Sequence, residues 1–175
     1  TRRSSDLPGI PAAVTVAGKA WEASASAANL SVKSGSYQDC NPYVALSPAT
    51  DTGTEQMVEC YVEHWSHGLT LSAVPSASYD VYVYTWQDWN QPSPGTVNFS
   101  VNGAVTQANY AISTQPGHWE RLGPWRVSVT AGSLALTTSG ADIKLSGLEV
   151  WRVTSGGATA VPAPPPGAGG GGPLA

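Results

Sequence analysis

Apolar and polar residues alternate along most of the chain with the period of two that is typical of half-buried β-strands. The predicted strands, each bounded by turn residues, are residues 12–18, 57–65, 69–74, 79–86, 96–103, 125–132, 133–140 and 145–153. Alternation argues against a parallel sheet, whose strands are usually continuous apolar runs. The pattern therefore predicts an all-β fold, an antiparallel jelly-roll β-sandwich.

Two local signals refine this prediction. Asn102-Gly103 is a strong signal for a two-residue hairpin turn. Residues 40–53 show no regular alternation, and we expect them to hold a short helical turn.

The two ends of the chain do not follow this pattern. Residues 1–11 are interpreted as a non-native leader, because their first residues resemble a translated sequencing adapter; an ordinary polar linker is the alternative. Residues 154–175 join a stiff proline run to a glycine run, which is typical of an interdomain linker or a disordered C-terminal tail. The predicted module is then residues 12–153, covalently linked to a neighbouring domain.

Composition narrows the range of partners. Of the 175 residues 11% are charged, and the net charge of −4 argues against nucleic acid and anionic membranes. No apolar run approaches the roughly 18 to 20 residues of a membrane-spanning helix. The chain holds 7 Trp and 7 Tyr but only 1 Phe, a choice that favours rings with a polar tip at half-wet positions.

Cys40 and Cys60 are the two cysteines of the chain. A disulfide between them would stabilise the fold by about 3 kcal/mol in the chain-entropy model. Two buried free thiols are the alternative. The disulfide is favoured, because low charge, abundant Ser and Thr and the Pro/Gly linker are typical of a secreted module.

The sequence has no motif for nucleotide binding, nucleophilic catalysis or a structural metal. His64 and His67 fall on opposite faces of a strand, so they are not expected to share a metal ion. No Asp- and Asn-rich loop demands calcium. The 12 acidic residues could include a glycosidase pair, but the sequence alone does not pair them. We therefore predict no catalytic residues, no metal and no cofactor.

Aromatic residues on two strands carry the strongest functional signal. In residues 79–86, Tyr82, Tyr84 and Trp86 share a face with a carboxylate, whereas Val81 and Val83 face the core. The strand at 57–65 repeats this arrangement with the outward residues Glu59, Tyr61, Glu63 and Trp65.

Flat rings bury the apolar face of a sugar, and acidic or amide groups bind its hydroxyls, so the two strands suit a glycan. Residues 86–91, WQDWNQ, combine both residue types in one loop. The alternative is that the rings lie under a covering segment such as residues 36–54. Trp21, Trp125 and Trp151 are interpreted as structural.

Four segments carry a family resemblance: residues 40–46, 79–90, 117–132 and 137–153. The most specific parts are GHWERLGPW and LSGLEVWR. These segments resemble malectin-like carbohydrate-binding modules of the galactose-binding-domain-like group. The resemblance implies a β-sandwich appended to secreted bacterial polysaccharide-degrading enzymes, with glycan-binding loops at one end. The aromatic and acidic loop pattern falls on Trp86, Asp88 and Trp89, with Asp142 as a weaker match.

The predicted ligand-binding residues are Trp65, Tyr82, Tyr84, Trp86, Asp88, Trp89, Asn90, Trp119 and Asp142. They define two competing locations, the sheet face and the end loops, of which the loops are favoured and the face is their extension. The predicted function is non-catalytic binding of a polysaccharide or oligosaccharide by a monomeric module of a secreted or cell-surface bacterial protein. A structural spacer or protein-interaction domain is the alternative, followed by a glycoside hydrolase or polysaccharide lyase.

Overall fold

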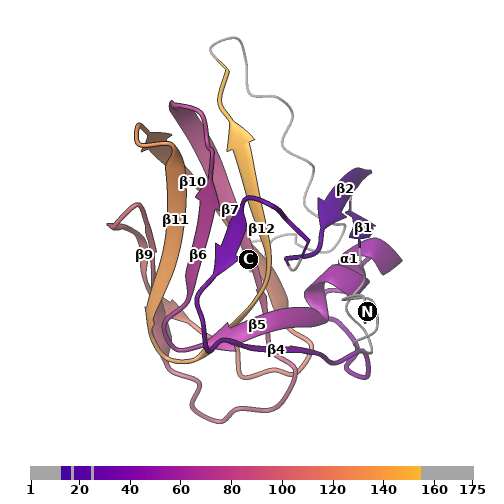
Figure 1. The fold of residues 1–175 in the computed structure, drawn as a ribbon. Coiled ribbons are helices and arrows are strands. Elements are labelled where there is room, and N and C mark those ends of the chain that lie inside the picture. The colour runs from indigo at the N-terminus through magenta and orange to yellow at the C-terminus, as the bar shows by residue number, and fades with distance from the viewer. Residues whose placement is uncertain (1–12, 17, 25, 155–175) are drawn as a thin grey trace, which may run out of the picture.

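The structure is a computed structural model that describes residues 13–16, 18–24 and 26–154 (Figure 1). The predicted leader and C-terminal tail lie outside these residues, apart from Thr154. No helix within the described part of the chain is long and apolar enough to cross a membrane.

Two five-stranded antiparallel sheets face each other and form a sandwich (Figure 1). The β7 sheet contains, in spatial order, β10 (Trp119–Val129), β7 (Ala77–Trp86), β12 (Ile143–Arg152), β5 (Cys60–His64) and β4 (Tyr37–Cys40). The β8 sheet contains β3 (Leu30–Val32), β6 (Gly68–Ser72), β11 (Ser133–Gly140), β8 (Thr96–Val101) and β9 (Ala104–Ala111). A hairpin of β1 (Ala13–Val16) and β2 (Lys19–Glu22) and the helix α1 (Thr52–Val58) complete the fold. The predicted all-β antiparallel sandwich is confirmed.

The predicted elements differ from the observed ones in a few places. The hairpin turn at Asn102-Gly103 is confirmed, since both residues have positive φ between β8 and β9. The strand predicted at residues 57–65 is wrong at its start, because Met57 and Val58 end α1. This helix begins after Asp51, whose carboxylate accepts the backbone N–H of Thr54 at 3.0 Å.

Four strands were not predicted: β2, β3, β4 and β9. The first three have only three or four residues, too few to show alternation. Strand β9 lies at a sheet edge and is largely exposed, so it has no apolar face to produce a pattern.

The main core lies between the two sheets. Val81 and Val83 of β7 face Phe99, Leu134 and Leu136 of the β8 sheet, and all five are fully buried. The predicted inward face of β7 is therefore confirmed. Trp125, interpreted from its strand position as structural, joins this core and contacts Phe99 at a ring distance of 5.2 Å.

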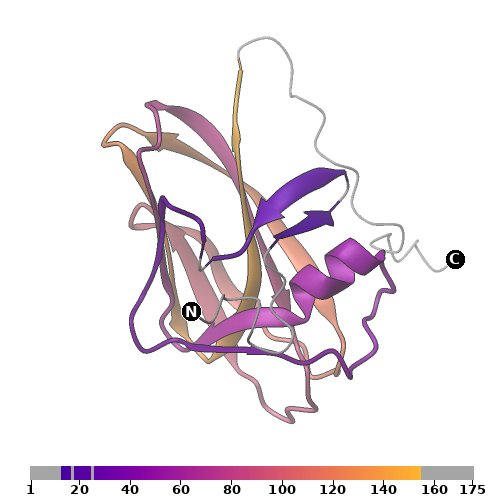
Figure 2. The ribbon, with the colours of Figure 1, turned by 45° about the vertical axis from the view of Figure 1, so that its right-hand side comes forward.

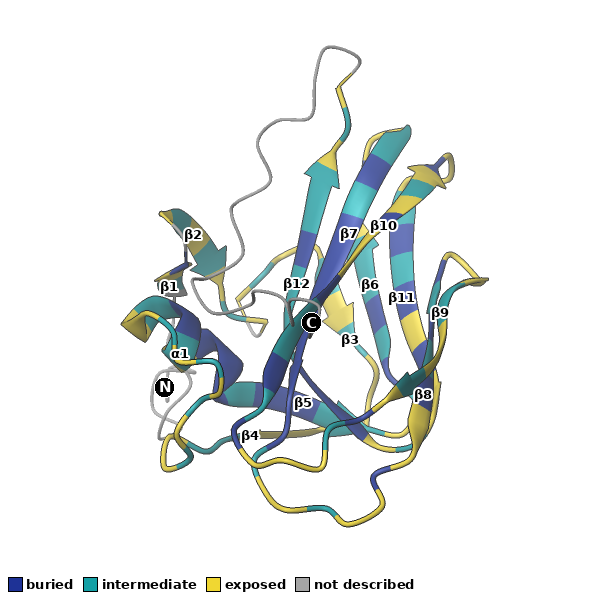
Figure 3. Cartoon of the chain, turned by 180° about the vertical axis from the view of Figure 1, so that it is seen from behind, coloured by how far each residue is buried: buried dark blue, intermediate teal, exposed yellow. Residues whose placement is uncertain are grey.

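A second apolar core covers the other face of the β7 sheet. It consists of Val16, Met57, Val58, Tyr61, Tyr84, Trp86 and Trp119, with Val14, Trp21, Val44 and Leu46 against them. The β1–β2 hairpin, α1 and the connection at residues 41–51 supply the covering residues (Figure 2). The β7 sheet is consequently buried on both faces, as the dark blue of β7 shows in Figure 3.

Gly147 sets how closely this covering layer can approach. A β-bulge between Leu145 and Gly147 interrupts the pairing of β12 with β7. A Cβ atom at Gly147 would lie 2.6 Å from Met57 Sδ and 2.9 Å from Trp21 Cζ3. Glycine at this position therefore lets the helix and the hairpin rest directly on β12.

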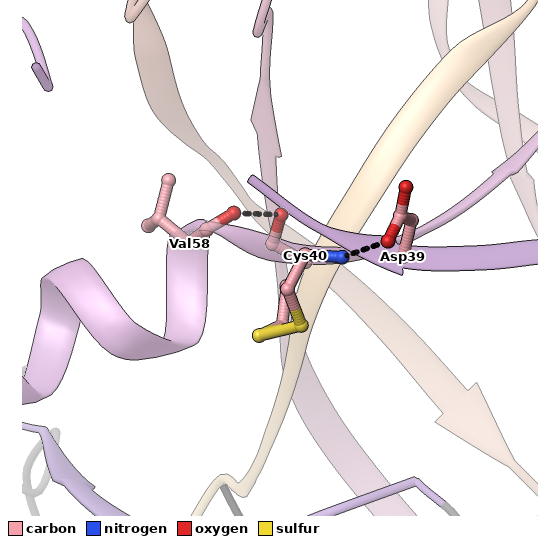
Figure 4. Close-up of a disulfide and its surroundings, with 5 residues drawn as sticks. Asp39, Cys40 and Val58 are labelled. Atoms are coloured by element: carbon pink, nitrogen blue, oxygen red, sulfur yellow. Dashed lines mark hydrogen bonds between the residues drawn. A yellow bond between two sulfur atoms is a disulfide. The ribbon is translucent and has the colours of Figure 1, made fainter. Parts of the chain in front are cut away.

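A disulfide joins Cys40 of β4 to Cys60 of β5, as the favoured interpretation predicted (Figure 4). The two cysteines are directly paired in the register of the strands, and their Cα atoms are 4.0 Å apart. The backbone N–H of Cys40 donates to Asp39 Oδ1 at 2.8 Å (Figure 4). The covalent link holds the edge strand β4 against β5.

The buried environment of His67 should make the stability of the fold depend on pH. Its Nε2 lies 2.6 Å from the carbonyl of Ile143, and its buried Nδ1 has no partner among the described residues. A proton added at Nδ1 would be buried without an acceptor, and burial lowers the pKa of His67 to about 4 from its usual 6.5.

The unfolded chain binds this proton below about pH 6.5, whereas the folded chain does not until about pH 4. The His67 contribution to the free energy of unfolding is complete above pH 6.5. Below it, this contribution should fall by up to roughly 1.4 kcal/mol per pH unit. Urea denaturation from pH 7 to pH 4 should show a smaller decline in His67→Gln than in the wild type. Parallel declines in the two proteins would contradict the assignment.

Candidate functional site

One end of the β7 sheet brings together most of the predicted ligand-binding residues. Ile143 at the start of β12 pairs with His64 at the end of β5, and Lys144 pairs with Trp86 at the end of β7. Trp119, which begins β10, also pairs with Trp86. The segments after β5 and β7 and before β10 and β12 therefore meet at one end, which we call the loop end and which lies at the bottom of Figure 1.

Exposed aromatic rings lie at this end. Trp65 is 68% exposed and Trp89 is 50% exposed, so both rings are accessible. Asn90 and Asp142 are also exposed there, in the segments that carry them away from β7 and into β12. Tyr37, at the start of β4, is 58% exposed.

The strand register places a row of polar side chains on the outer face beside these rings. Tyr37 pairs with Glu63, Asp39 pairs with Tyr61, and Lys144 pairs with Glu63. Directly paired residues project from the same face of a sheet, and residues two apart on one strand share that face. The five side chains therefore form one surface, which we call the charged row.

Lys144 is the centre of the charged row. Its side chain is 5% exposed, and its Nζ lies 2.7 Å from Glu63 Oε1 and 3.3 Å from Asp88 Oδ1. Asp88 Oδ2 accepts the Tyr61 hydroxyl at 3.3 Å and the Asn41 amide at 3.4 Å. One buried ammonium thus fixes two carboxylates, which keeps the acidic groups in defined positions.

Backbone hydrogen bonds fasten the loops of the loop end to one another. The N–H of Gly117 donates to Gln87 at 2.6 Å, and the N–H of Ser47 donates to Gly117 at 2.8 Å. The indole N–H of Trp119 donates to the carbonyl of Pro48 at 2.7 Å. The residues around Gly117, just before β10, therefore bond on one side to the segment after β7 and on the other side to residues 41–51.

Four predicted ligand residues are not on the surface: Tyr82, Tyr84, Trp86 and Trp119, which are 2–4% exposed. The expectation that their face is wet is wrong, because the second core covers it. Of the interpretations weighed for Tyr82 and Tyr84, the one that placed a covering segment over them is correct. Residues 41–51 supply only part of this cover, and the hairpin and α1 supply the rest.

A buried ion pair accompanies these rings. Arg121 Nη2 donates to Glu149 Oε2 at 2.8 Å, and the Tyr84 hydroxyl donates to Glu149 Oε1 at 2.6 Å. Burial opposes the charge of Glu149, but these hydrogen bonds outweigh it and hold its pKa below the usual range. The guanidinium of Arg121 also lies 3.5 Å from the ring centre of Tyr82. These contacts pair the charges of Arg121 and Glu149, whereas the buried Tyr82 hydroxyl, Trp86 Nε1 and Arg121 Nε have no hydrogen-bond partner among the described residues.

Sequence reasoning missed Tyr37, Asp39, Asn41 and Lys144. The predicted disulfide was the available signal for Tyr37 and Asp39, because it places the segment before Cys40 beside β5. Lys144 gave no signal of its own, since it follows an exposed Asp142 and its partners are 81 and 56 positions earlier in the chain.

A separate cleft of about 430 Å3 opens between the β1–β2 hairpin, β3, β6 and β12. Its walls are mostly apolar and include Trp21, Leu30, Met57, Leu71, Leu145 and Trp151. None of the predicted ligand-binding residues lines it. Tyr61 of the charged row also lines the cleft, so the cleft borders the loop end without containing the predicted ligand residues.

Within the described residues, no group of three or more His, Cys, Asp or Glu side chains is arranged to hold a metal ion. The rings of His64 and His67 are 6.1 Å apart, and the two side chains have different partners. His64 Nδ1 accepts the N–H of Ser66, while His67 is bound to the carbonyl of Ile143.

Comparison with solved structures identifies chains of similar fold. The ectodomain of ANX2 from Arabidopsis thaliana matches with a TM-score of 0.61 and 11% identity, over 79% of this chain and 45% of that chain. Bacteroides uniformis beta-glucuronidase 2 matches with a TM-score of 0.58 and 13% identity, over 86% of this chain and 19% of that chain. A family 35 carbohydrate binding module from Clostridium thermocellum matches with a TM-score of 0.45 and 13% identity, over 71% and 92%.

At these identities the likeness shows the fold alone. The chain spans under half of the ANX2 ectodomain and about a fifth of the glucuronidase. No family model and no curated protein sequence matches it. The sandwich fold implied by the malectin-like resemblance is confirmed, and the function has to be argued from the loop end.

Gly117 provides a test of how the loop end is held. Its φ is +80°, and a Cβ atom there would lie 2.0 Å from the carbonyl oxygen of Ala45. Gly132 has a similar φ of +72° but open space around it. An alanine at either position is strained by about 1 kcal/mol, because the backbone there has a positive φ. Only Gly117→Ala would also push the neighbouring loops apart. Denaturation should show a clearly larger loss of stability for Gly117→Ala than for Gly132→Ala; equal losses would contradict the close contact.

Proposed function

We propose that this chain is a non-catalytic carbohydrate-binding module whose binding surface is the loop end. The observation that carries the proposal is the placement of exposed Trp65, Trp89 and Tyr37 around a row of fixed carboxylates. The proposed ligand residues from the original set are Trp65, Asp88, Trp89, Asn90 and Asp142, and Tyr37, Asp39 and Glu63 are added to them. Tyr82, Tyr84, Trp86 and Trp119 support the surface from within.

The exposed rings supply the apolar part of such a surface. Single exposed aromatic rings are common on protein surfaces, whereas several at one end of a molecule are typical of a binding surface. The apolar face of a pyranose is flat and matches an indole or phenol ring in size. Three such rings on different loops give an extended glycan several places at which to stack.

The charged row supplies the polar part. Carboxylates accept hydrogen bonds from sugar hydroxyls, and those of Glu63 and Asp88 are already oriented by Lys144. Because these groups are fixed before the ligand arrives, little conformational entropy is lost when a sugar binds. The combination favours binding of a sugar over a purely apolar partner.

The proposed role is to dock a covalently linked enzyme or surface protein onto polysaccharide outside the cell. The disulfide fits an oxidising compartment, and the glucuronidase shows that a domain of this fold can form part of a much longer chain. Bacterial origin, secretion and the monomeric state remain part of the proposal.

A hydrolase or lyase is the second candidate, because Glu63 and Asp88 lie close enough to contact one ammonium group. The position of Lys144 argues against this role, since its Nζ fills the space between the carboxylates in which a scissile bond would have to lie. A glycan array and an assay for released reducing sugar, both on the full chain, would separate the two functions. Binding without release supports the module.

Removal of single rings tests the surface. Trp89→Ala and Trp65→Ala should each weaken the affinity for a glycan identified on the array by at least fivefold, about 1 kcal/mol. Their melting temperatures should stay close to that of the wild type, because both rings are exposed. Isothermal titration calorimetry measures the affinity without depending on tryptophan fluorescence.

Two controls accompany this experiment. Val105 is 64% exposed on β9 of the other sheet, so Val105→Ala should leave the affinity unchanged. Trp86→Ala opens the second core and should cost about 3 to 5 kcal/mol of stability. If both Trp89→Ala and Trp65→Ala bind the glycan as tightly as the wild type, the loop end is not the binding surface.

A further inference from the structure

Negatively charged side chains outnumber positively charged ones at the loop end. Asp39, Glu63 and Asp88 bring three carboxylates to the outer face, and Lys144 contacts two of them, Glu63 and Asp88. The exposed Asp142 adds a fourth carboxylate at the start of β12. Lys33 follows β3, and its Nζ donates to Ser66 in the segment after β5, so a second cation lies beside Trp65 and leaves the carboxylates in excess.

Part of this negative charge is free to meet a ligand. Lys144 Nζ contacts Oε1 of Glu63, and Oε2 of Glu63 has no hydrogen-bond partner among the described residues. Asp88 Oδ1 is buried and accepts no hydrogen bond within the described chain, although Lys144 Nζ lies 3.3 Å away. Because this oxygen is enclosed beside the ammonium, Glu63 Oε2 is the oxygen of the pair that a ligand can contact, and Asp88 adds its negative charge from beneath the surface.

The three carboxylates act as one electrostatic patch. The hydrogen bond to Asp39 raises the pKa of the Tyr37 hydroxyl, and the charges of Asp39, Glu63 and Asp88 raise it further. Burial raises the pKa of Tyr61, and the same three charges add to this effect. Two phenols on neighbouring strands therefore respond to all three carboxylates, although Tyr37 is exposed to water.

We infer that the loop end selects glycans that carry protonated amino groups, such as β-linked glucosamine oligomers, over neutral glycans, and that it disfavours uronic acids. This inference rests on the proposed carbohydrate-binding function and adds the substrate class. The ammonium group of an amino sugar would donate to Glu63 Oε2 while the sugar ring stacks on Tyr37, Trp65 or Trp89. The carboxylate of a uronic acid would meet like charge at the same place.

Glucosamine and N-acetylglucosamine oligomers of equal length and linkage form a matched pair that differs in charge. Calorimetry on the full chain, at a mildly acidic pH that keeps the amines protonated and the protein folded, should show at least tenfold tighter binding of the glucosamine oligomer. This ratio should shrink as salt is added, because exposed charges are screened. A galacturonate oligomer of the same length should bind more weakly than the N-acetylated one.

Single substitutions test which carboxylates cause the preference for amino sugars. Glu63→Gln and the exposed Asp39→Asn should each lower the ratio of the two affinities at least threefold. Glu22→Gln makes the same change of net charge on β2, outside the loop end, and should leave the ratio unchanged. If Glu22→Gln lowers the ratio as much as Glu63→Gln does, the preference comes from the net charge and the inference is wrong.

The remaining outcomes separate the inference from the proposed function. Equal or tighter binding of the N-acetylated oligomer overturns the preference for amines and leaves carbohydrate binding in place. If neither oligomer binds, the preference is also overturned, and the array of neutral glycans decides the proposed function. An array without any bound glycan would overturn that function.

Discussion

Burial of the β7 sheet on both faces is the constraint on which the rest of the molecule depends. One face packs against the β8 sheet, and the other carries Tyr84, Trp86 and Trp119 beneath the hairpin and α1. A sheet covered on both sides has to satisfy its polar groups internally, because water cannot reach them. The pairing of Arg121 with Glu149 and of Lys144 with two carboxylates meets this requirement for the charges, although the Tyr82 hydroxyl and Trp86 Nε1 are buried without a hydrogen-bond partner among the described residues.

The same constraint limits where a ligand can bind. With both faces of β7 occupied, its aromatic residues can support a site but cannot contact a glycan. Apart from the cleft beside the β1–β2 hairpin, the sheet is open at its end, where the strands give way to loops. There the loops are tied to one another by backbone hydrogen bonds around Gly117 and Gln87. Exposed Trp89 thus projects from a segment whose backbone is held, which is what a preorganised binding surface needs.

Much of the fold could be predicted from the sequence, because alternation is a local property. Val81 and Val83 were correctly placed in the core, and Asn102-Gly103 was correctly identified as a turn. The opposite face of β7 could not be assigned by the same means. A tyrosine beside polar residues produces the same pattern whether water or a third layer covers it. The segments that cover this face, such as β2, are too short for their structure to be recognised from the sequence. Trp21 of β2, which contacts Tyr84, is also more than 60 residues away from it in the chain.

The candidate site shows the same division between local and distant information. Trp89 and Asp88 are neighbours in one loop, so their combination could be recognised without a structure. Glu63 and Lys144 are 81 positions apart and meet only because β5 and β12 pair. The buried ammonium is what turns scattered acidic residues into a surface, since without it Glu63 and Asp88 would repel each other and Asp88 would be buried as an unpaired charge. Because one cation serves two carboxylates, the pairing that stabilises the loop end also leaves it negatively charged, and the need to bury the outer face of β7 thereby determines the charge that a ligand meets.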